Sequence, residues 1–234
     1  MSHEYYQPPG SDFDAPPPGP FTIGSYVDQR FTVLLLGAGL LGHALLSLGM
    51  VGVDLWTYSL VNDVAVGRVS HGALETRDTL ATAILQLRSL CYLGTGILTL
   101  VYLHRASQNA RALGAEGMEY TPGWTVGWWF VPFANWFKPY AVVKELWVAS
   151  GHGDNAFQIP AAIPVWWGTY VVMTLGGSAS SMLFRSQSMD GLATGSIFHA
   201  TVLIVGVIGA YLAWQVFSGI HTRQRGKAAE LGHG

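Results

Sequence analysis

The side chains that could do chemistry in this sequence are a few ionisable residues inside long apolar stretches. Asp54, Arg88 and His199 each interrupt such a stretch. An ionisable group in hydrocarbon is unfavourable unless it is partnered or reaches water, so it is the first place to look for function. At about 1.5 Å of helix rise per residue, all three fall in the outer third of a membrane. Two interpretations stand: an outward-facing pocket for an anionic or protonatable ligand, or a structural ion pair of Arg88 with Asp54 beside a hydrogen-bonded His199.

The remaining reactive residue types form no catalytic or metal-binding pattern. The sequence has no G-x-S-x-G, H-E-x-x-H or P-loop motif. His43 lies near mid-membrane, whereas His199 is too far out and His104 too far in to share a metal or haem with it. Cys91 is the single cysteine, so neither an intramolecular disulfide nor a two-cysteine metal pair is possible. We expect no enzyme activity, no cofactor and no metal.

The composition is that of an integral membrane protein. Half of the residues are apolar and 11% are charged, against about 25% charged residues in soluble domains. The net charge of −2 and the scattered arginines do not fit a nucleic-acid binder, which carries a clustered basic surface. We therefore expect membrane lipids, and no nucleic acid, as partners.

The hydropathy pattern predicts an all-α membrane protein with four transmembrane helices. A span needs about 20 predominantly apolar residues. Four stretches meet this requirement, at about residues 31–60, 79–104, 160–184 and 191–218. Residues 30–220 therefore form one transmembrane domain, flanked by a tail at each end.

The basic residues predict the orientation of these spans. Four crossings place both termini and residues 105–158 on one side of the membrane. That side holds Arg30, Arg105, Arg111, Lys138, Lys144, Arg223, Arg225 and Lys227, and the other side holds Arg68, Arg77 and Arg185. Because cytoplasmic segments are enriched in basic residues, both termini should be cytoplasmic.

The two tails differ in length and composition. Residues 1–29 carry six of the eleven prolines and little to bury, so they read as a disordered, proline-rich cytoplasmic tail that is a possible ligand for a cytoplasmic protein. Residues 221–234 read as a short cytoplasmic tail. Nothing in the sequence indicates an oligomeric state.

Residues 121–150 read TPGWTVGWWFVPFANWFKPYAVVKELWVAS and are ambiguous between a span and a loop. The uncharged part ends at residue 137, so it is short for a span, and the prolines at 122, 132 and 139 break the stretch as they would a loop. Tryptophan is common at the headgroup level. These properties favour an interfacial or re-entrant hairpin on the cytoplasmic side, between the second and third spans, over a fifth span. Its second arm, from Pro139 to about Ser150, reads as an amphipathic helix on the membrane surface, with Lys138 and Lys144 at the anionic leaflet.

A wider pattern around this hairpin resembles a known family. The pattern R-x-x-x-N-x-x-x-L-G, then T-P-G-W-x-V-G-W-W-F-V-P-F-A-N-x-x-K-P-Y, then K-E-L-W-x-A-S is similar to the bacterial membrane family known as domain of unknown function 4328. The residues that carry the likeness are Arg105, Asn109, Pro122, Gly123, Trp124, Trp128, Trp129, Pro132, Asn135, Lys138, Pro139, Glu145 and Trp147. The resemblance implies a four-helix protein of the bacterial plasma membrane, and it supplies no activity.

Two classes of function follow from these observations. In the first, the hairpin is a platform and the protein is a scaffold, sensor or partner-binding membrane subunit. In the second, the hairpin enters the mouth of the helix bundle and forms a pocket or path for a small solute or lipid, with Asn135 and Arg105 as polar contacts. The sequence shows no polar track that joins both faces of the membrane, so the first class is preferred.

Overall fold

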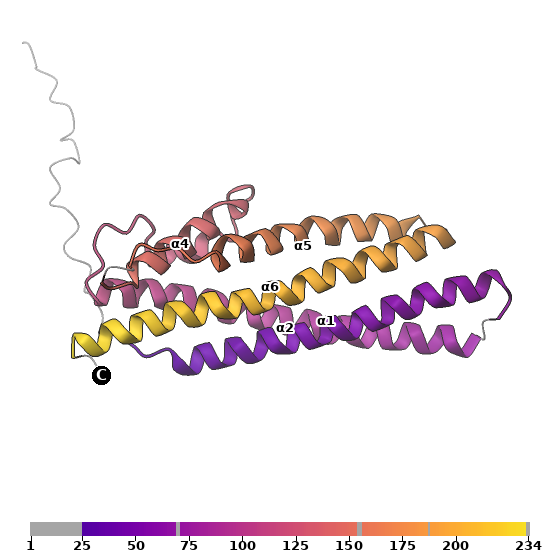
Figure 1. The fold of residues 1–234 in the computed structure, drawn as a ribbon, viewed down its shortest axis with the longest axis horizontal. Coiled ribbons are helices and arrows are strands. Elements are labelled where there is room, and N and C mark those ends of the chain that lie inside the picture. The colour runs from indigo at the N-terminus through magenta and orange to yellow at the C-terminus, as the bar shows by residue number, and fades with distance from the viewer. Residues whose placement is uncertain (1–24, 69–70, 154–155, 187, 233–234) are drawn as a thin grey trace, which may run out of the picture.

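The computed structural model describes residues 25–68, 71–153, 156–186 and 188–232, and these residues form helices and connecting turns without a strand (Figure 1). The elements are α1 (Arg30–Ala65), α2 (His71–Ala112), α3 (Pro122–Gly127), the 3-10 turn η2 (Ala134–Trp136), α4 (Lys138–Ala149), α5 (Ala162–Arg185) and α6 (Met189–Glu230). The expectation of an all-helical protein is thereby confirmed.

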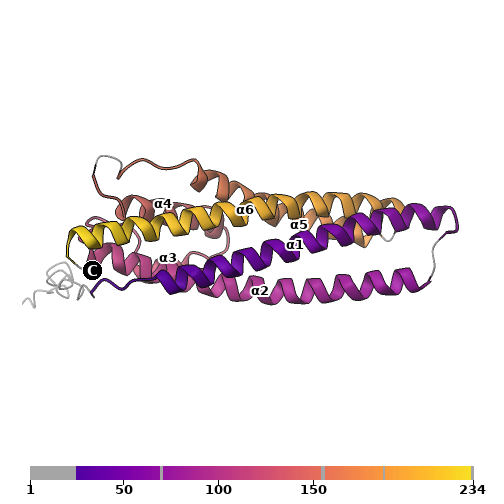
Figure 2. The same ribbon diagram turned by 60° about the horizontal axis from the view of Figure 1, so that its bottom comes forward.

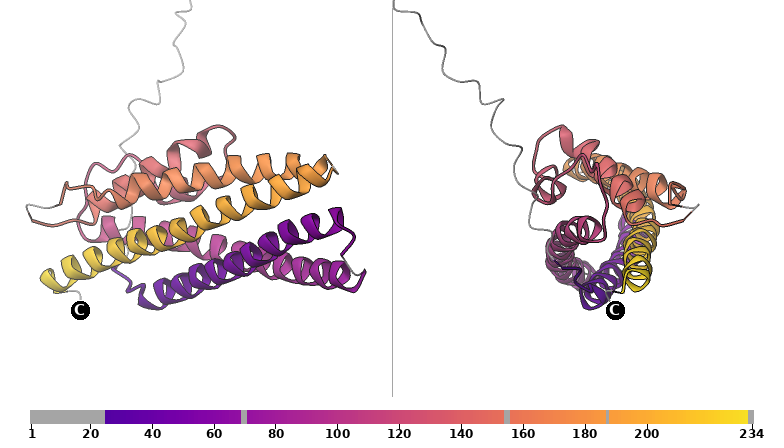
Figure 3. Two further views of the ribbon diagram at one scale, coloured as in Figure 1. Left: turned by 45° about the vertical axis from the view of Figure 1, so that its right-hand side comes forward. Right: turned by 90° about the vertical axis from the view of Figure 1, so that its left-hand side faces the viewer.

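The four long helices run side by side and form an open arc. α1 packs against both α2 and α6, and α6 packs against α5, so α2 and α5 lie at the two edges (Figures 2 and 3). One end of the molecule, here called the base, holds the start of α1, the end of α6 and the short helices α3 and α4. The opposite end, here called the far end, holds the end of α1, the start of α2, the end of α5 and the start of α6.

Glycines let neighbouring helices approach closely. A Cβ atom at Gly39 of α1 would stand 2.4 Å from Thr95 Oγ1 of α2, and one at Gly209 of α6 would stand 2.5 Å from Thr169 Oγ1 of α5. Lipid gives no hydrophobic drive for helix association, so close backbone contact through small residues is the means by which such helices pack. Glycines at these positions therefore help to determine which helices lie next to each other, because a larger side chain would not fit there.

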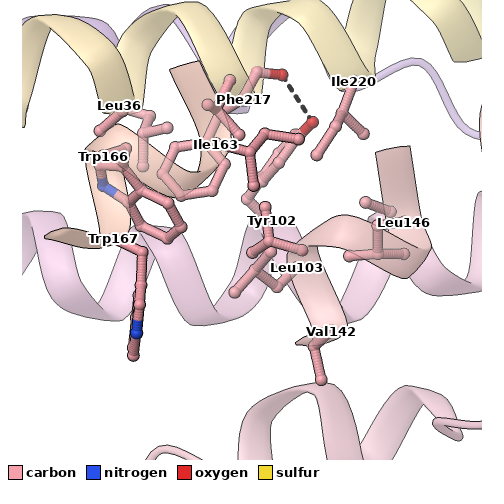
Figure 4. Packing of buried hydrophobic residues seen from close by; sticks show 14 of the residues in the cluster. Leu36, Tyr102, Leu103, Val142, Leu146, Ile163, Trp166, Trp167, Phe217 and Ile220 are labelled. Atoms are coloured by element: carbon pink, nitrogen blue, oxygen red, sulfur yellow. Dashed lines mark hydrogen bonds between the residues drawn. The ribbon is translucent and has the colours of Figure 1, made fainter. Parts of the chain in front are cut away.

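The hydrophobic core lies at the base. Figure 4 shows Tyr102 of α2, Val142 and Leu146 of α4, and Phe217 of α6 packed together, all buried. The Tyr102 hydroxyl donates a hydrogen bond to the Phe217 carbonyl at 2.8 Å. A smaller buried cluster of α1 and α6 side chains lies further along the bundle. The base is thus the part of the molecule in which most elements meet.

The helices agree with the predicted spans in position, but three of them qualify as spans by length and hydropathy. These three are α1 up to Val64, α2 and α6. α5 does not qualify, although its 24 residues would reach across a bilayer. The three are also longer than expected: α2 begins at His71, and α6 continues to Glu230 through residues that we expected to form the C-terminal tail.

Residues 121–150, here called the cap, fold as α3, η2 and α4 across the opening of the arc at the base. α3 packs on α2, while α4 contacts α2, α5 and α6 (Figure 3). The expected helix after Pro139 is present as α4. We predicted a helix on the membrane surface, but the apolar side of α4, formed by Val142, Val143 and Leu146, is fully buried among the other helices. α4 therefore contributes to the protein core.

Candidate functional site

The first candidate site is a buried acid–histidine pair toward the far end. Asp54 of α1 is fully buried, and its Oδ2 lies 2.8 Å from Nδ1 of His199 on α6. The other carboxylate oxygen is buried without a hydrogen-bond partner among the described residues. An acid in hydrocarbon is stabilised by such a partner, so the pair joins α1 to α6 through one strong polar contact.

Arg88 of α2 stands near this pair but does not complete it. No ion pair within 4.0 Å joins it to Asp54 in the described part of the chain, although the two groups interact electrostatically. Its Nε is buried without a hydrogen-bond partner. The structure therefore brings together two of the three predicted pocket residues. The partner of Asp54 is His199, and not Arg88 as the ion-pair interpretation held.

His43 lies between these groups and the base. It is buried on α1, and its ring centroid is 5.7 Å from that of Tyr92 on α2. No group of three or more metal-ligating side chains occurs within the described residues.

The second candidate site is a polar network that holds the base together. The Asn109 side chain of α2 accepts a hydrogen bond from the Val27 N–H at 3.0 Å and donates one to the Val27 carbonyl at 2.8 Å. Buried Gln224 of α6 donates to the Ala106 carbonyl at 2.8 Å and to Ser150 Oγ at 2.9 Å. Residues 25–29, which we expected to belong to the disordered tail, are thus fastened to the bundle. Residues 1–24 lie outside the described residues.

A charged cluster fastens the start of the cap to α4. Glu145 accepts hydrogen bonds from the backbone N–H groups of Glu119 and of Tyr120, the latter at 3.3 Å. Burial raises the pKa of Glu145, and these two hydrogen bonds oppose that rise. Arg111 donates to the Tyr120 carbonyl at 2.8 Å. Lys138 donates to the Tyr120 hydroxyl at 3.3 Å and lies 5.3 Å from the Trp128 ring centroid, so it is engaged within the protein as well as placed at the surface.

The tryptophans of the cap divide between two partners. Trp128 packs on Trp124, with ring centroids 4.5 Å apart. Trp129 instead makes edge contacts with Trp167 and Tyr170 of α5, each at 6.1 Å. The Trp167 indole also donates to the Trp136 carbonyl at 3.1 Å. Tyr170 is eight residues into α5, so the turn of the cap lies beside α5 up to about 12 Å from the start of that helix.

This turn presents three phenylalanines outward. Phe130, Phe133 and Phe137 are 71%, 85% and 73% exposed. Phe133 is the only non-glycine residue with positive φ among the described residues, at 64°. An L-residue in this region costs about 1–2 kcal/mol, so the fold holds an exposed aromatic ring at the tip at the expense of backbone strain.

The remaining family-like residues have simpler surroundings. Trp147 donates to the Gln158 carbonyl at 2.9 Å, and its ring lies 4.7 Å from the Arg223 guanidinium. Arg105 is exposed, whereas Asn109, one helical turn further along α2, is buried. The Asn135 side-chain oxygen is buried without a hydrogen-bond partner within the described residues. Pro122 begins α3, Gly123 faces open space and Pro132 is exposed. Pro139 is the second residue of α4 and is buried.

A third feature, the outer face of α2, was not predicted from the sequence. None of the apolar stretch that qualifies α2 as a span is buried within the chain. The side of α2 that points away from α1 carries an exposed stripe at alternating four- and three-residue spacing. This stripe, here called the α2 stripe, consists of Thr79, Thr82, Gln86, Ser89, Leu93 and Gly96. The sequence does contain a signal for this stripe, because polar residues recur at intervals of three and four positions inside the predicted second span.

Other contributors were missed because they look ordinary in a sequence. Gln224 lies in the predicted tail, and Glu119 and Tyr120 lie in a predicted loop. Their roles depend on contacts within the folded base between separate segments of the chain. The buried Gln224 amide donates to the Ala106 carbonyl, and Lys138 donates to the Tyr120 hydroxyl. The base of the molecule is therefore a structural site to which both family-like residues, such as Asn109 and Glu145, and other residues, such as Gln224, contribute.

Comparison with known proteins gives one match. The model of the family described as domain of unknown function 4328 matches residues 65–222. This range includes all of the family-like residues and begins at the end of α1. No curated protein and no solved structure matches the chain.

Proposed function

The chain belongs to the family described as domain of unknown function 4328, and we propose that it is a scaffold or partner-binding subunit within the plasma membrane of a bacterium. It is an integral, all-helical protein by the length and hydropathy of its helices. The proposed role is to bind another membrane-embedded helix rather than to catalyse a reaction.

The observation that carries this proposal is the exposed α2 stripe. Lipid tails cannot hydrogen-bond, so a lipid-facing helix surface is ordinarily apolar. The hydroxyls of Thr79 and Ser89 are satisfied by their own helix, donating to the carbonyls of Glu75 and Leu85 at 2.8 Å each. Gln86 has no hydrogen bond within the described part of the chain. Its amide favours a partner helix at this edge of the arc.

The proposal includes four spans with both termini cytoplasmic. α5 and α6 pack against each other in antiparallel directions, which supports a crossing by α5 as well (Figure 1). Four crossings keep the basic residues of the base on one side, in agreement with the positive-inside bias. The base is then cytoplasmic, and the Asp54–His199 pair lies toward the outer surface.

The cap is proposed to be re-entrant at shallow depth. Its turn lies beside the first turns of α5, and Phe130, Phe133 and Phe137 point away from the protein. In a membrane, these rings would rest in the hydrocarbon of the inner leaflet. Cysteine at position 130 or 134, in a Cys91→Ser background, should not react with membrane-impermeant maleimide applied outside intact cells; reaction of position 130 from outside would instead indicate a fifth span.

The helix-binding role is tested by photocrosslinking in intact cells. A photoreactive phenylalanine at Leu93, which lies on the α2 stripe, should give an adduct of discrete mass. The same probe at Leu87, equally exposed but on another side of α2, is the matched control. Absence of a protein adduct from both positions, with lipid adducts alone, contradicts the proposal.

The proline-rich N-terminal residues suggest a second kind of partner. We propose that residues 1–24 offer a proline-rich ligand to a cytoplasmic protein, since six prolines lie between residues 8 and 20. Deletion of residues 1–20 should abolish copurification of that protein while the chain still inserts and keeps its thermal stability. Unchanged copurification would remove this part of the proposal.

Lipid binding is the alternative function, and one observation favours it. A shallow hollow of about 340 Å³ lies between α5 and α6 and is almost wholly apolar. It is lined chiefly by Val172, Leu175, Gly176, Phe198, Val202 and Val205. Such a surface fits an acyl chain, because its one polar side chain, Thr201, already donates its hydroxyl to the Ile197 carbonyl of its own helix at 2.9 Å. Lipid analysis of the purified protein should detect enrichment of one species if this alternative holds.

A further inference from the structure

We infer that the partner helix on the α2 stripe is α2 of a second copy of this chain, so that the protein forms a parallel two-fold dimer. This inference rests on the proposed function, because it names the occupant of the same face. It is carried by the position, spacing and hydrogen-bonding capacity of Gln86.

Membrane orientation restricts how two copies can meet. All copies insert in the same direction, so two α2 helices can associate only in parallel within one membrane. A two-fold axis along the membrane normal then brings each stripe residue to the same depth as its counterpart. Gln86 of one copy consequently faces Gln86 of the other.

The glutamine amide is complementary to itself. It has an acceptor oxygen and two N–H donors, so two facing amides can each donate to the other. A partner of another kind would need a matching polar group at the same depth, whereas a second copy supplies one by symmetry. The α2 stripe carries no charge between Thr79 and Gly96, and two copies therefore approach without like-charge repulsion.

The spacing of the stripe fits a close helix pair. The intervals of three and four residues, from Thr79 through Thr82, Gln86 and Ser89 to Gly96, are those of a left-handed helix pair. Small side chains on both sides of Gln86 permit the backbones to approach. A polar residue at one interface position also fixes the register, as buried asparagine does in coiled coils.

Disulfide crosslinking of the full chain tests the inference. In a Cys91→Ser background, Thr82→Cys and Ser89→Cys should give a covalent dimer on mild oxidation in membranes. Leu80→Cys and Leu87→Cys, which are exposed on other sides of α2, should remain monomeric. Gln86→Leu added to Ser89→Cys should lower the rate of dimer formation about fivefold, whereas Gln86→Asn should retain most of it.

Other outcomes distinguish the failure of the dimer from the failure of the proposed helix-binding function. Equal crosslinking at all four positions, or a monomer in lipid nanodiscs by mass photometry at every protein-to-lipid ratio, overturns the dimer. If the probe at Leu93 then gives an adduct with a different protein, helix binding stands and only the dimer fails. If it gives no protein adduct, both fail. Gln86→Leu removes a polar group from a membrane helix. If the monomeric variant melts at the same temperature as the monomeric parent, its loss of crosslinking is not caused by misfolding.

Discussion

The Asp54–His199 pair shows how single residues decide which helices meet. Both groups are costly in hydrocarbon, and each reduces the cost of the other through one hydrogen bond of 2.8 Å between α1 and α6. Asn109 plays the corresponding part at the base, where its amide binds both backbone groups of Val27. At this scale the structure uses a few polar contacts to select among helices that are otherwise similarly apolar.

Replacing His199 tests the value of the pair. His199→Ala leaves the Asp54 carboxylate buried and unpartnered, which should lower the free energy of unfolding by about 3 kcal/mol. Thermal unfolding in detergent measures the effect. The double variant Asp54→Asn, His199→Ala should recover part of the loss because the charge is gone. A single variant as stable as the parent would show that the pair is not structural.

Removing the Asn109 amide should release the segment before α1. Asn109→Ala takes away two hydrogen bonds to Val27, at a cost of about 2 kcal/mol. Hydrogen exchange at residues 25–29 should accelerate at least tenfold, since the Val27 N–H loses its acceptor. Gln108→Ala, at an exposed neighbouring position, is the control and should leave exchange unchanged. Equal protection in both variants contradicts the role given to Asn109.

At the scale of elements, α5 and α6 are held by contacts that only glycine allows. A Cβ at Gly176 would stand 2.6 Å from a Val202 methyl group, whereas one at Gly177 meets nothing within 4 Å. The two positions are adjacent in one helix and share the same gain in helix propensity on substitution by alanine. Alanine substitutions at these two positions therefore separate the effect of packing on stability from the effect of helix propensity.

Alanine substitutions at the two glycines are expected to change the stability of the protein in opposite directions. Gly177→Ala should raise the stability of the detergent-solubilised protein by up to about 1 kcal/mol through helix propensity. Gly176→Ala should lower it by about 1 kcal/mol or more, because Val202 must move in a packed interface. Equal melting temperatures of the two variants would mean that the α5–α6 contact is looser than described.

The elements were more predictable than their contacts. Long, predominantly apolar runs are sufficient to locate α1, α2, α5 and α6, although α1, α2 and α6 continue beyond these runs. The burial of α4 was not predictable, since Val142 and Leu146 would look the same on a surface helix and in a core. The partner of Asp54 also depended on how the helices pack, because α1 has both α2 and α6 as neighbours and it is His199 of α6 that lies 2.8 Å from the carboxylate.

At the scale of the whole molecule, the number of spans decides where the C-terminus lies. With four spans, Ser186 at the far end is outside and Thr222 at the base is cytoplasmic. With three spans, α5 would stay on the inner side and these two positions would exchange sides. Impermeant maleimide applied to intact cells should therefore label Ser186→Cys and spare Thr222→Cys, each in a Cys91→Ser background. The reverse labelling would exclude the four-span arrangement.

The length of α6 has a mechanical consequence. Its 42 residues contain no proline and extend about 63 Å, roughly twice the hydrocarbon thickness. His199 lies near one end and Gln224 near the other. A rigid tilt of such a helix by about 5° about its midpoint would move Gln224, which is about 22 Å from that midpoint, by about 2 Å. A displacement of that size would be enough to break the Gln224 hydrogen bonds at the base, which are 2.8 and 2.9 Å long.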